Sequence, residues 1–448
     1  MRFICRIVAG VPESIMRASA VHIASRLSDA GHVAWFAGGC VRDRLLGFEP
    51  KDYDIATDAT PEEVLQVFPR ARTVGAHFGV VLVHHKGQDF EIATFREDGE
   101  YLDGRRPEGV IFSSPEGDAR RRDFTVNGLY EKPESGEIVD FVGGRADLEA
   151  GILRAIGSPE ERFAEDHLRM LRAVRFATRF GFEIDPATWE SVRRNSSHLS
   201  RISPERIRAE FDKILLGPER VRGFDLLVES GLMRSVIPEI YDLQGCQQPP
   251  EFHPEGDVFT HVRLMLSHAR ADACLNILLS VLLHDIAKPA TQVWSDEKGR
   301  FTFNGHAEAG AEMAERVLRR LRYPNAVIEA VVASVAHHMK FLDAEQMRRS
   351  TLRRFMGRDR FEEELELHRL DALGSNGDLS RHSFITSELE AFQNEPVVPA
   401  PLLNGRDLIE RGFASGPELG QVLDELQTLQ LEGELTDREA ALEWLKSQ

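Results

Sequence analysis

The spacing of hydrophobic and polar positions divides the chain into a mixed N-terminal part and a longer helical part. Up to about residue 155, short runs of alternating or continuous apolar residues between turn residues predict β-strands. These runs are HVAWFAG, KDYDIAT, GVVLVHH, DFEIATF and GEIVDFV. Before them, SIMRASAVHIASRLSDAG has apolar residues at helical spacing and predicts an amphipathic helix that ends at Gly31. Beyond residue 155 helical periodicity prevails, so the pattern predicts an α+β head followed by an all-α remainder.

The change to the helical pattern is marked by a helix start. Ser158 is a suitable cap, Pro159 occupies the first helical position and Glu161 completes a capping box, and the helical pattern continues to Gly181. Weaker breaks follow in GCQQPPEFHPEG and NEPVVPAP, where helix-interrupting residues gather. We therefore expect four parts: a head, a helical neck, a helical body and a helical tail. Their ranges are 1–155, 156–245, 246–375 and 376–448.

Composition limits the classes of protein that this chain can be. It has 448 residues, of which 42% are hydrophobic and 29% charged, a balance typical of a globular protein with several domains. The four cysteines lack the spacing of a zinc site, which indicates a reducing compartment, so a cytoplasmic location is expected. The apolar runs in MRFICRIVAG and CLNILLSVLL are too short for a signal peptide and a membrane span, so no membrane partner is expected. No pattern indicates an obligate protein partner.

The formal net charge is −18, so a nucleic acid would have to be bound by local basic patches rather than by the overall field. Two stretches qualify. One is the arginine-rich segment from Arg162 to Arg222, and the other is RRSTLRRFMGRDR, which ends before Phe361. A solvated helix face explains the second stretch equally well when it is taken alone.

The segment KDYDIAT holds two aspartates with a spacing that suits a metal site. Asp52 and Asp54 are two positions apart on a predicted strand, so both carboxylates project from one face while Tyr53 and Ile55 point to the other. Paired carboxylates suit magnesium ions, which can promote the attack of a hydroxyl on a nucleotide. Glu91, on a later strand, is the candidate third ligand if strand pairing brings it across. By itself, an Asp-x-Asp pair is more often part of an ordinary surface strand.

A glycine pair precedes these aspartates. Gly38 and Gly39 follow the apolar strand HVAWFA and precede a predicted helix that carries Arg42 and Asp43. Glycines let backbone N–H groups approach phosphate oxygens, a helix start favours anions, and Arg42 adds a rigid fork of donors. A tight turn that needs glycine is the alternative for the pair alone. Together with the two aspartates, the pair predicts a triphosphate whose reacting phosphorus lies beside metal ions, an arrangement that serves nucleotidyl transfer.

The order of these motifs resembles the class II tRNA nucleotidyltransferase and bacterial poly(A) polymerase family, within the polymerase β superfamily. The resemblance continues through four further motifs. They are RRDFTVN (121–127), DFVGGRADL (140–148), RFAEDHLRMLRAVRF (162–176) and RISPERIR (201–208).

The resemblance implies a polymerase β-like nucleotidyltransferase head with a mixed sheet, and Mg²⁺ as its cofactor. It assigns Asp52, Asp54 and Glu91 as the catalytic acids. It also implies a set of residues that contact the nucleotide or support those that do, with Asp123 and Asn127 shaping the sugar pocket. This set is Gly39, Arg42, Arg122, Asp123, Asn127, Arg172 and Arg175.

In this family an aspartate and an arginine three positions apart read the incoming base, and they match Asp166 and Arg169 in EDHLRMLRAVR. On one helix this spacing makes the two side chains neighbours on one face. Cytosine and adenine both present a ring-nitrogen acceptor beside an exocyclic amino donor, whereas guanine and uracil reverse the pattern. An arginine donor beside an aspartate acceptor therefore selects C and A without a nucleic-acid template. For an isolated Asp-x-x-Arg, a surface ion pair is the alternative.

Histidines and aspartates recur in the helical body. His284 and Asp285 interrupt the apolar helix of LLHDIAK, where a polar pair is costly without partners, so metal ligation is the natural interpretation. With His261 and Asp371 the pair resembles the ligand set of the HD phosphohydrolase superfamily, which implies a second divalent metal. The alternative is a helical RNA-binding scaffold with buried, hydrogen-bonded histidines. The region also contains His306, His337 and His338.

These observations predict an enzyme that adds C and A to the 3′ end of tRNA from CTP and ATP and releases pyrophosphate. An A-adding enzyme and a poly(A) polymerase share the motifs and are alternatives. The segment TFREDGEYLDGRRPEGV (94–110) matches a flexible loop thought to help the change from C to A addition, and disfavours an enzyme that adds C alone. An HD phosphohydrolase acting on RNA ends or nucleotides is the alternative from another reaction class. Arginines of the neck and of the stretch before Phe361 are expected to hold the acceptor stem through its backbone and shape.

Overall fold

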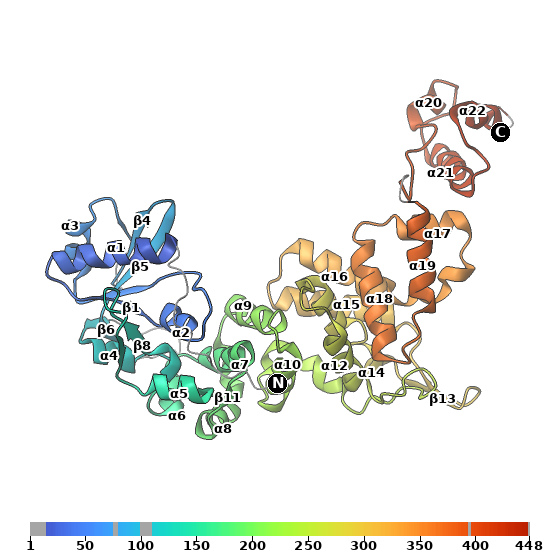
Figure 1. Cartoon of the computed structure of the whole chain (residues 1–448). Helices are drawn as coiled ribbons and strands as arrows, with labels where there is room; N and C mark the ends of the chain where they lie inside the picture. Colours follow the sequence, from blue (N-terminus) through green and yellow to red (C-terminus); the bar gives the residue numbers. More distant parts are fainter. Residues whose placement is uncertain (1–14, 75–78, 99–109, 393–395, 447–448) are drawn as a thin grey trace. The chain divides into compact units, whose positions relative to one another are not determined.

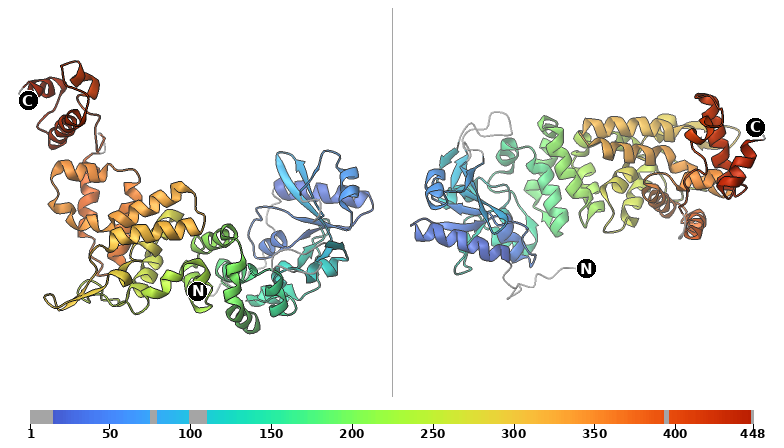
Figure 2. Two further views of the ribbon diagram at one scale, coloured as in Figure 1. Left: turned by 180° about the vertical axis from the view of Figure 1, so that it is seen from behind. Right: turned by 90° about the horizontal axis from the view of Figure 1, so that it is seen from above.

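The computed structural model of the chain describes residues 15–74, 79–98, 110–392 and 396–446. It divides into two compact units, the first ending at Pro238 and the second beginning at Glu239. The first unit holds a sheet-based head and a set of helices, and the second is nearly all helical (Figures 1 and 2). This is the α+β class that the sequence pattern predicts.

A seven-stranded mixed sheet forms the centre of the head, in the order β3-β4-β5-β2-β1-β8-β9. Its strands are β1 (Ala34–Ala37), β2 (Ile55–Thr57), β3 (Arg72–Thr73), β4 (Val80–His85), β5 (Gln88–Thr94), β8 (Leu129–Glu131) and β9 (Ile138–Asp140). β2 runs parallel to β5, with Ile55 opposite Ile92, and antiparallel to β1. Helix α1 (Ile15–Asp29) contacts β1, buries Ile23 and ends before Gly31, as predicted.

Strand β2 is shorter than the sequence pattern predicts. Asp52, Tyr53 and Asp54 lie just before its first residue, although pairing with β1 continues, since the N–H of Ala37 donates to the carbonyl of Asp54 at 3.0 Å. The predicted alternation is confirmed, because Tyr53 and Ile55 are buried while both aspartates are exposed. The two carboxylates therefore lie on the solvent side of this end of the sheet.

Short helices connect the strands, and a helical region follows the sheet. The helices are α2 (Gly39–Leu45), α3 (Pro61–Val67), α4 (Pro115–Arg120), η2 (Thr125–Asn127), α5 (Gly144–Ala150), α6 (Pro159–Glu165), α7 (Arg169–Phe180), α8 (Pro186–Asn195), η3 (Ser196–Arg201), α9 (Pro204–Leu215), α10 (Arg220–Glu229) and α11 (Met233–Val236). Two small strand pairs complete the unit, and α7 packs against α9 and α10. The pairs are β6 (Arg96–Asp98) with β7 (Val110–Phe112), and β10 (Ile152–Leu153) with β11 (Glu183–Ile184).

The single helix predicted from Ser158 to Gly181 is in fact two. The first, α6, begins as predicted, because the Ser158 hydroxyl accepts a backbone N–H three residues later. It ends before Asp166, whose backbone is extended (φ −143°, ψ 105°). The Asp166 carboxylate accepts the N–H of Leu168 at 3.1 Å, a local bond that competes with helix continuation. The prediction that Asp166 and Arg169 share one helix face is therefore wrong.

The second unit consists of helices and one hairpin. Its elements are η4 (Pro238–Leu243), α12 (Val258–His268), α13 (Leu275–Leu283), α14 (Lys288–Thr291), β12 (Val293–Ser295), β13 (Arg300–Thr302), α15 (His306–Arg320), α16 (Asn325–His337), η5 (His338–Gln346), α17 (Arg349–Met356), α18 (Phe361–Gly374), α19 (Ser380–Ala391), α20 (Gly405–Ile409), α21 (Pro417–Glu432) and α22 (Arg438–Leu445). Helix α13 is apolar, almost wholly buried, and packed against α12, α16 and α18. Among the described residues, no helix has the length and apolar character needed to cross a membrane.

The basic stretch before Phe361 holds the C-terminal part of the chain together. Arg353 is buried and donates to the carbonyl of Val397 at 2.7 Å, and Arg354 pairs with Asp424 at 2.9 Å. Two more of its arginines pair with glutamates of α18. Most of these guanidinium groups already have partners in the described structure, and the expectation that the stretch holds the acceptor stem stays a prediction.

Candidate functional site

Three carboxylates meet where β2 and β5 lie side by side. Because these strands are parallel and Ile55 is opposite Ile92, Asp54 and Glu91, one residue before each, are neighbours. Although Asp54 reaches solvent, the surrounding protein displaces part of its water, and this, followed by the negative charges of Asp52 and Glu91, raises the pKa of Asp54 from 3.8 to about 6. A bound divalent cation would relieve this repulsion. The three acids therefore fit a magnesium site in their chemistry and placement.

The glycine turn lies at the same end of the sheet. Since β1 runs antiparallel to β2, its last residue Ala37 is bonded to Asp54, and the turn follows directly. Gly38 has φ +70°, and a Cβ there would lie 2.6 Å from Arg122 Nη1, so the arginine packs directly on the turn. Arg122 also forms an ion pair with Asp118 at 3.0 Å, which fixes its side chain. Gly39 is the first residue of α2. The turn thus places backbone and a guanidinium beside the acids.

Arg42 does not lie where the sequence pattern predicts. Expected as a donor to phosphate, it is only 4% exposed. Its guanidinium donates to Asp43 at 2.8 Å and to Asn127, and stacks 4.9 Å from the centre of the Phe176 ring and 4.6 Å from that of Phe180. These partners satisfy the charge inside the protein. In this structure Arg42 therefore supports the turn from within, and its expected part in binding the nucleotide stays a prediction.

Asp123 links the head to α7. It accepts hydrogen bonds from Asn127 at 2.9 Å and from Arg172 at 2.7 Å. Burial favours the neutral acid, but Arg172 and Asn127 outweigh it and hold the pKa of Asp123 well below its ordinary value. Arg172 is left partly exposed, whereas Arg175 is buried and pairs with Glu210 of α9 at 2.5 Å. Arg175 therefore ties two helices together and acts as a support.

The predicted base-reading pair lies at the junction of α6 and α7, each member with its own partner. Asp166 accepts a hydrogen bond from Arg206 of α9 at 2.7 Å. Arg169 pairs with Glu165 and donates to the carbonyl of Arg121 at 3.2 Å. Both side chains are mostly withdrawn from solvent, at 18% and 11% exposure. The two residues stand on either side of the helix break, where the N–H of Arg169 donates to the carbonyl of Asp166 at 3.0 Å.

The expected flexible loop at 94–110 falls largely outside the described residues, which exclude 99–109. Its two ends form the antiparallel pair β6–β7, with Arg96 opposite Phe112. The interpretation of this loop therefore stays a prediction.

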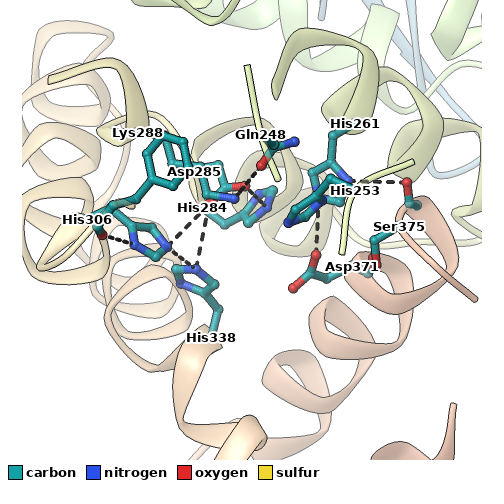
Figure 3. Close-up of polar contacts among 12 residues, drawn as sticks. Gln248, His253, His261, His284, Asp285, Lys288, His306, His338, Asp371 and Ser375 are labelled. Atoms are coloured by element: carbon teal, nitrogen blue, oxygen red, sulfur yellow. Dashed lines mark hydrogen bonds and ion pairs between the residues drawn. The ribbon is translucent and has the colours of Figure 1, made fainter. Parts of the chain in front are cut away.

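The four predicted HD residues converge in the second unit (Figure 3). His284 and Asp285 follow α13, His261 lies on α12 and Asp371 on α18. His261 Nε2 is 3.1 Å from Asp371 Oδ1, and His284 Nε2 is 3.0 Å from Asp285 Oδ2. His261, His284 and Asp285 are almost completely buried. His261, His284 and Asp285 can offer ligand atoms to one ion, and the expected role of all four residues as ligands stays a prediction.

Two histidines outside the predicted ligand set complete a second donor group. Nε2 of His306 lies 3.5 Å and Nε2 of His338 lies 3.8 Å from Asp285 Oδ1, and the two nitrogens are 3.1 Å apart. Lys288, also missed, lies 2.7 Å from the other Asp285 oxygen. Asp285 is therefore shared by two groups of donors (Figure 3). The available sequence signal was the recurrence of histidine at the ends of apolar helices.

The orientation of these histidines fits metal binding. Nδ1 of His284, His306 and His338 lies 3.0, 2.7 and 2.6 Å from the carbonyl three residues back. A carbonyl only accepts, so each Nδ1 carries the hydrogen and each Nε2 has a free electron pair. Among the described residues, Asp285 Oδ1 and the Nε2 atoms of His261 and His284 have no hydrogen-bond partner. Buried imidazole nitrogens and a carboxylate oxygen are a suitable donor set for a divalent metal.

Charge is unevenly distributed over this cluster. Burial opposes a proton on His261, but the carboxylates of Asp371 and Glu255 outweigh it and raise the pKa of His261 to about 9. Burial, together with the neighbouring His284, lowers the pKa of His338 to about 4. A metal ion would have to displace the proton from His261, whereas His338 is ready to bind at neutral pH.

Three protein-family models match the chain. A "Poly A polymerase head domain" matches residues 34–154, a "Probable RNA and SrmB- binding site of polymerase A" matches 181–243, and an "HD domain" matches 258–374.

The chain is similar to CCA-adding enzymes of other organisms. The CCA-adding enzyme of Geobacillus stearothermophilus is 46% identical over 214 residues, 48% of this chain and 53% of that protein. That of Latilactobacillus sakei is 40% identical over 263 residues, 57% of this chain and 66% of that protein. The matched part thus spans about half the length of the first relative.

Solved structures match over nearly the whole chain. The Bacillus stearothermophilus CCA-adding enzyme in complex with CTP has a TM-score of 0.73 at 28% identity, covering 97% of this chain and 98% of that one. A Thermotoga maritima CCA-adding enzyme complexed with tRNA shares the fold, with a TM-score of 0.62 at 21% identity, covering 96% and 94%.

Head, RNA-binding region and HD domain thus occur in one chain, in this order, with the carboxylates and the glycine turn in place. They define the class: a nucleotidyltransferase with a poly A polymerase head and an HD domain. Within it, the chain belongs to the family of tRNA nucleotidyltransferases and bacterial poly(A) polymerases, and the resemblance predicted from its motifs is confirmed.

Proposed function

We propose that the head adds C and A to the 3′ end of tRNA from CTP and ATP. The observation that carries the proposal is the meeting of Asp52, Asp54 and Glu91 beside the Gly38 turn and Arg122. The names of the relatives, and the CTP complex of a structure similar over nearly the whole chain, support it.

The geometry supports in-line transfer of a nucleotidyl group. The terminal hydroxyl of the RNA attacks the α-phosphorus, the bond to the pyrophosphate oxygen breaks, and pyrophosphate leaves. Mg²⁺ held by Asp52 and Asp54, with Glu91 beside them, would supply Lewis-acid stabilisation of the phosphate charge. Arg122 presents a guanidinium at the turn, where it can pair with phosphate oxygens. Arg172, fixed by Asp123, presents a second one from α7.

We also propose that Asp166 and Arg169 read the incoming base and that residues 156–245 act as the neck beneath it. Asp166 is fixed through both oxygens, one by Leu168 N–H and one by Arg206, and each oxygen keeps a free electron pair for an amino group. Arg169 keeps donors beyond its bond to Glu165. Residues 1–155, 246–375 and 376–448 complete the proposed division into head, body and tail.

The test offers the full chain tRNAs that end before CCA, after the first C and after the second C, each with one labelled NTP. The proposal expects C on the first two and A on the third. Addition to the third substrate alone would identify an A-adding enzyme, and long A tracts would identify a poly(A) polymerase. Incorporation from none of the four NTPs would overturn nucleotidyl transfer.

A second function is favoured by the HD cluster. The shared carboxylate of Asp285, flanked by buried imidazole nitrogens that face it, supports a divalent metal centre that hydrolyses phosphate esters at RNA ends or in nucleotides. Opening of 2′,3′-cyclic phosphate ends to monophosphates and phosphate release from 3′-phosphate ends, both measured with added Mn²⁺, Co²⁺ or Ni²⁺, test it. Release that is equal in the full chain and in Asp285→Asn would overturn it.

A further inference from the structure

The loop before α12 contains a buried carboxylate that neither proposed reaction uses. The side chain of Glu255 is only 5% exposed. A turn fixes its position: the N–H of Gly256, whose φ is +118°, donates to the carbonyl of His253 at 3.3 Å. Asp257 then caps α12 by accepting the N–H of Thr260 at 2.9 Å. The backbone on both sides of Glu255 is thus set, and the side chain is directed at the first turn of α12.

There it meets the ring of His261. Glu255 Oε1 lies 2.8 Å from His261 Nδ1 and 2.9 Å from His253 Nδ1. The carbonyl of Gly374 lies 3.2 Å from the same nitrogen of His261. A carbonyl only accepts, so His261 Nδ1 carries a hydrogen and points at two acceptors. The other nitrogen, Nε2, faces Asp371 and the HD cluster.

We propose that Glu255 is the positioning residue of the metal centre, acting through His261. Its carboxylate fixes the plane of the imidazole, keeps the hydrogen on Nδ1, and makes Nε2 a stronger electron-pair donor. His284, His306 and His338 are oriented by backbone carbonyls, which cannot be mutated, whereas His261 receives a charged acceptor. The inference rests on the proposed metal centre and names the residue that tunes it.

A rival arrangement uses the same atoms differently. His253, Glu255 and His261 could themselves hold an ion, since their donor atoms lie within 4.8 Å of one another. That ion would need the electron pair of His261 Nδ1. The Gly374 carbonyl beside this nitrogen accepts its hydrogen, so the geometry favours the positioning role.

The first test measures Co²⁺ affinity by calorimetry and visible absorption in the full chain, with Asp54→Asn present so that the head does not contribute. Glu255→Ala should weaken binding about 10–100-fold. Glu255→Gln should weaken Co²⁺ binding less than Glu255→Ala, because the amide oxygen still accepts the Nδ1 hydrogen. The matched control is Glu251→Ala, an exposed acid of the same loop that pairs with Arg300, which should bind Co²⁺ like the parent.

The second test uses ¹⁵N-histidine NMR on the zinc-loaded parent chain and does not depend on the folding of a variant. The expected spectrum shows His261 with hydrogen on Nδ1 and zinc on Nε2. Zinc on Nδ1, or unchanged Co²⁺ affinity in Glu255→Ala, would overturn the role of Glu255 while leaving the metal centre in place. A parent chain that binds no Co²⁺ would overturn both.

Discussion

Asp54 carries the clearest electrostatic signature of the head. Its pKa of about 6 lies above the ordinary 3.8, so the folded protein holds this proton more tightly than the unfolded chain. The tighter binding of this proton stabilises the folded protein. The stabilisation is complete below pH 3.8 and is lost as the pH rises through about 6. We therefore expect Asp54→Asn, measured with a chelator at pH 7.5, to raise the free energy of unfolding by ~1 kcal/mol, the effect being reduced by solvent at this exposed position.

The comparison between two pH values separates this effect from a general change in packing. The gain from Asp54→Asn should shrink at pH 4, where the parent carboxyl is protonated in the folded protein. Asp89→Asn, an exposed acid on β5, is the matched control and should show no such pH-dependent gain. A loss of stability in Asp54→Asn at pH 7.5 would contradict the charge repulsion.

Glu91 tests the third acid of the proposed site. Because Glu91 lies beside Asp54 through the β2–β5 register, Glu91→Gln keeps the shape but removes one charge from the metal-binding face. We expect kcat for CTP incorporation to fall about 100-fold or more, as for other losses of preorganised charge at a reacting phosphate. Asp89→Asn, two residues away on the same strand, should retain parental rates. Parental kcat in Glu91→Gln would remove this residue from the site.

At the scale of elements, the break between α6 and α7 positions Asp166, one of the two residues proposed to read the base. It turns Asp166 out of the helix and lets Arg206 hold its carboxylate. Removing Asp166 takes away the acceptor for the exocyclic amino group of C and A. In Asp166→Ala we expect the ratio of CTP to UTP incorporation to fall about 100-fold or more. Single-nucleotide kinetics check this, with exposed Glu161→Ala as the control, and an unchanged ratio would contradict the base-reading role.

The elements that the sequence could predict are those governed by periodicity and caps. The head strands, the helix ending at Gly31 and the helix start at Ser158 follow from local patterns. The break at Asp166 could not be predicted from periodicity, because a single bond from a side chain to the backbone outweighs a good helical pattern there. The burial of Arg42 likewise depends on contacts with residues far along the chain, such as Asn127 and Phe176, which local patterns do not show.

The candidate sites likewise contain residues that the sequence indicates and residues that only the fold brings together. The doublet of His284 and Asp285 stands out in sequence because it interrupts an apolar helix. His306 and His338 stand at the N-terminus of α15 and just after α16, and only the packing of these helices with α13 brings their nitrogens to the carboxylate of Asp285. The segment that contains Glu255 is rich in helix-interrupting residues and predicts only a break between helices. Convergence of distant donors is a property of the fold, which one sequence does not reveal.

At the scale of the whole molecule, each compact unit carries its own proposed metal site. The head acids belong to the unit that ends at Pro238, and the HD cluster belongs to the unit that begins at Glu239. Sites that share no partners contribute independently. We therefore expect His338→Ala to reduce phosphate release about 100-fold, since it removes a donor beside Asp285, while CTP and ATP incorporation stay at the parental rate. Exposed His268→Ala is the matched control.

Asp54→Asn is the reciprocal variant, and with His338→Ala and the double variant it forms a double-mutant cycle. The cycle distinguishes two independent active sites from a single shared one. Asp54→Asn should abolish incorporation and leave phosphate release unchanged, and the double variant with His338→Ala should show the product of the two single effects. A double variant no worse than one single variant would indicate that both activities use one centre. Phosphate release that disappears in Asp54→Asn would point to pyrophosphate chemistry of the head. Independence would mean that the HD unit is a second active site rather than only a scaffold for RNA.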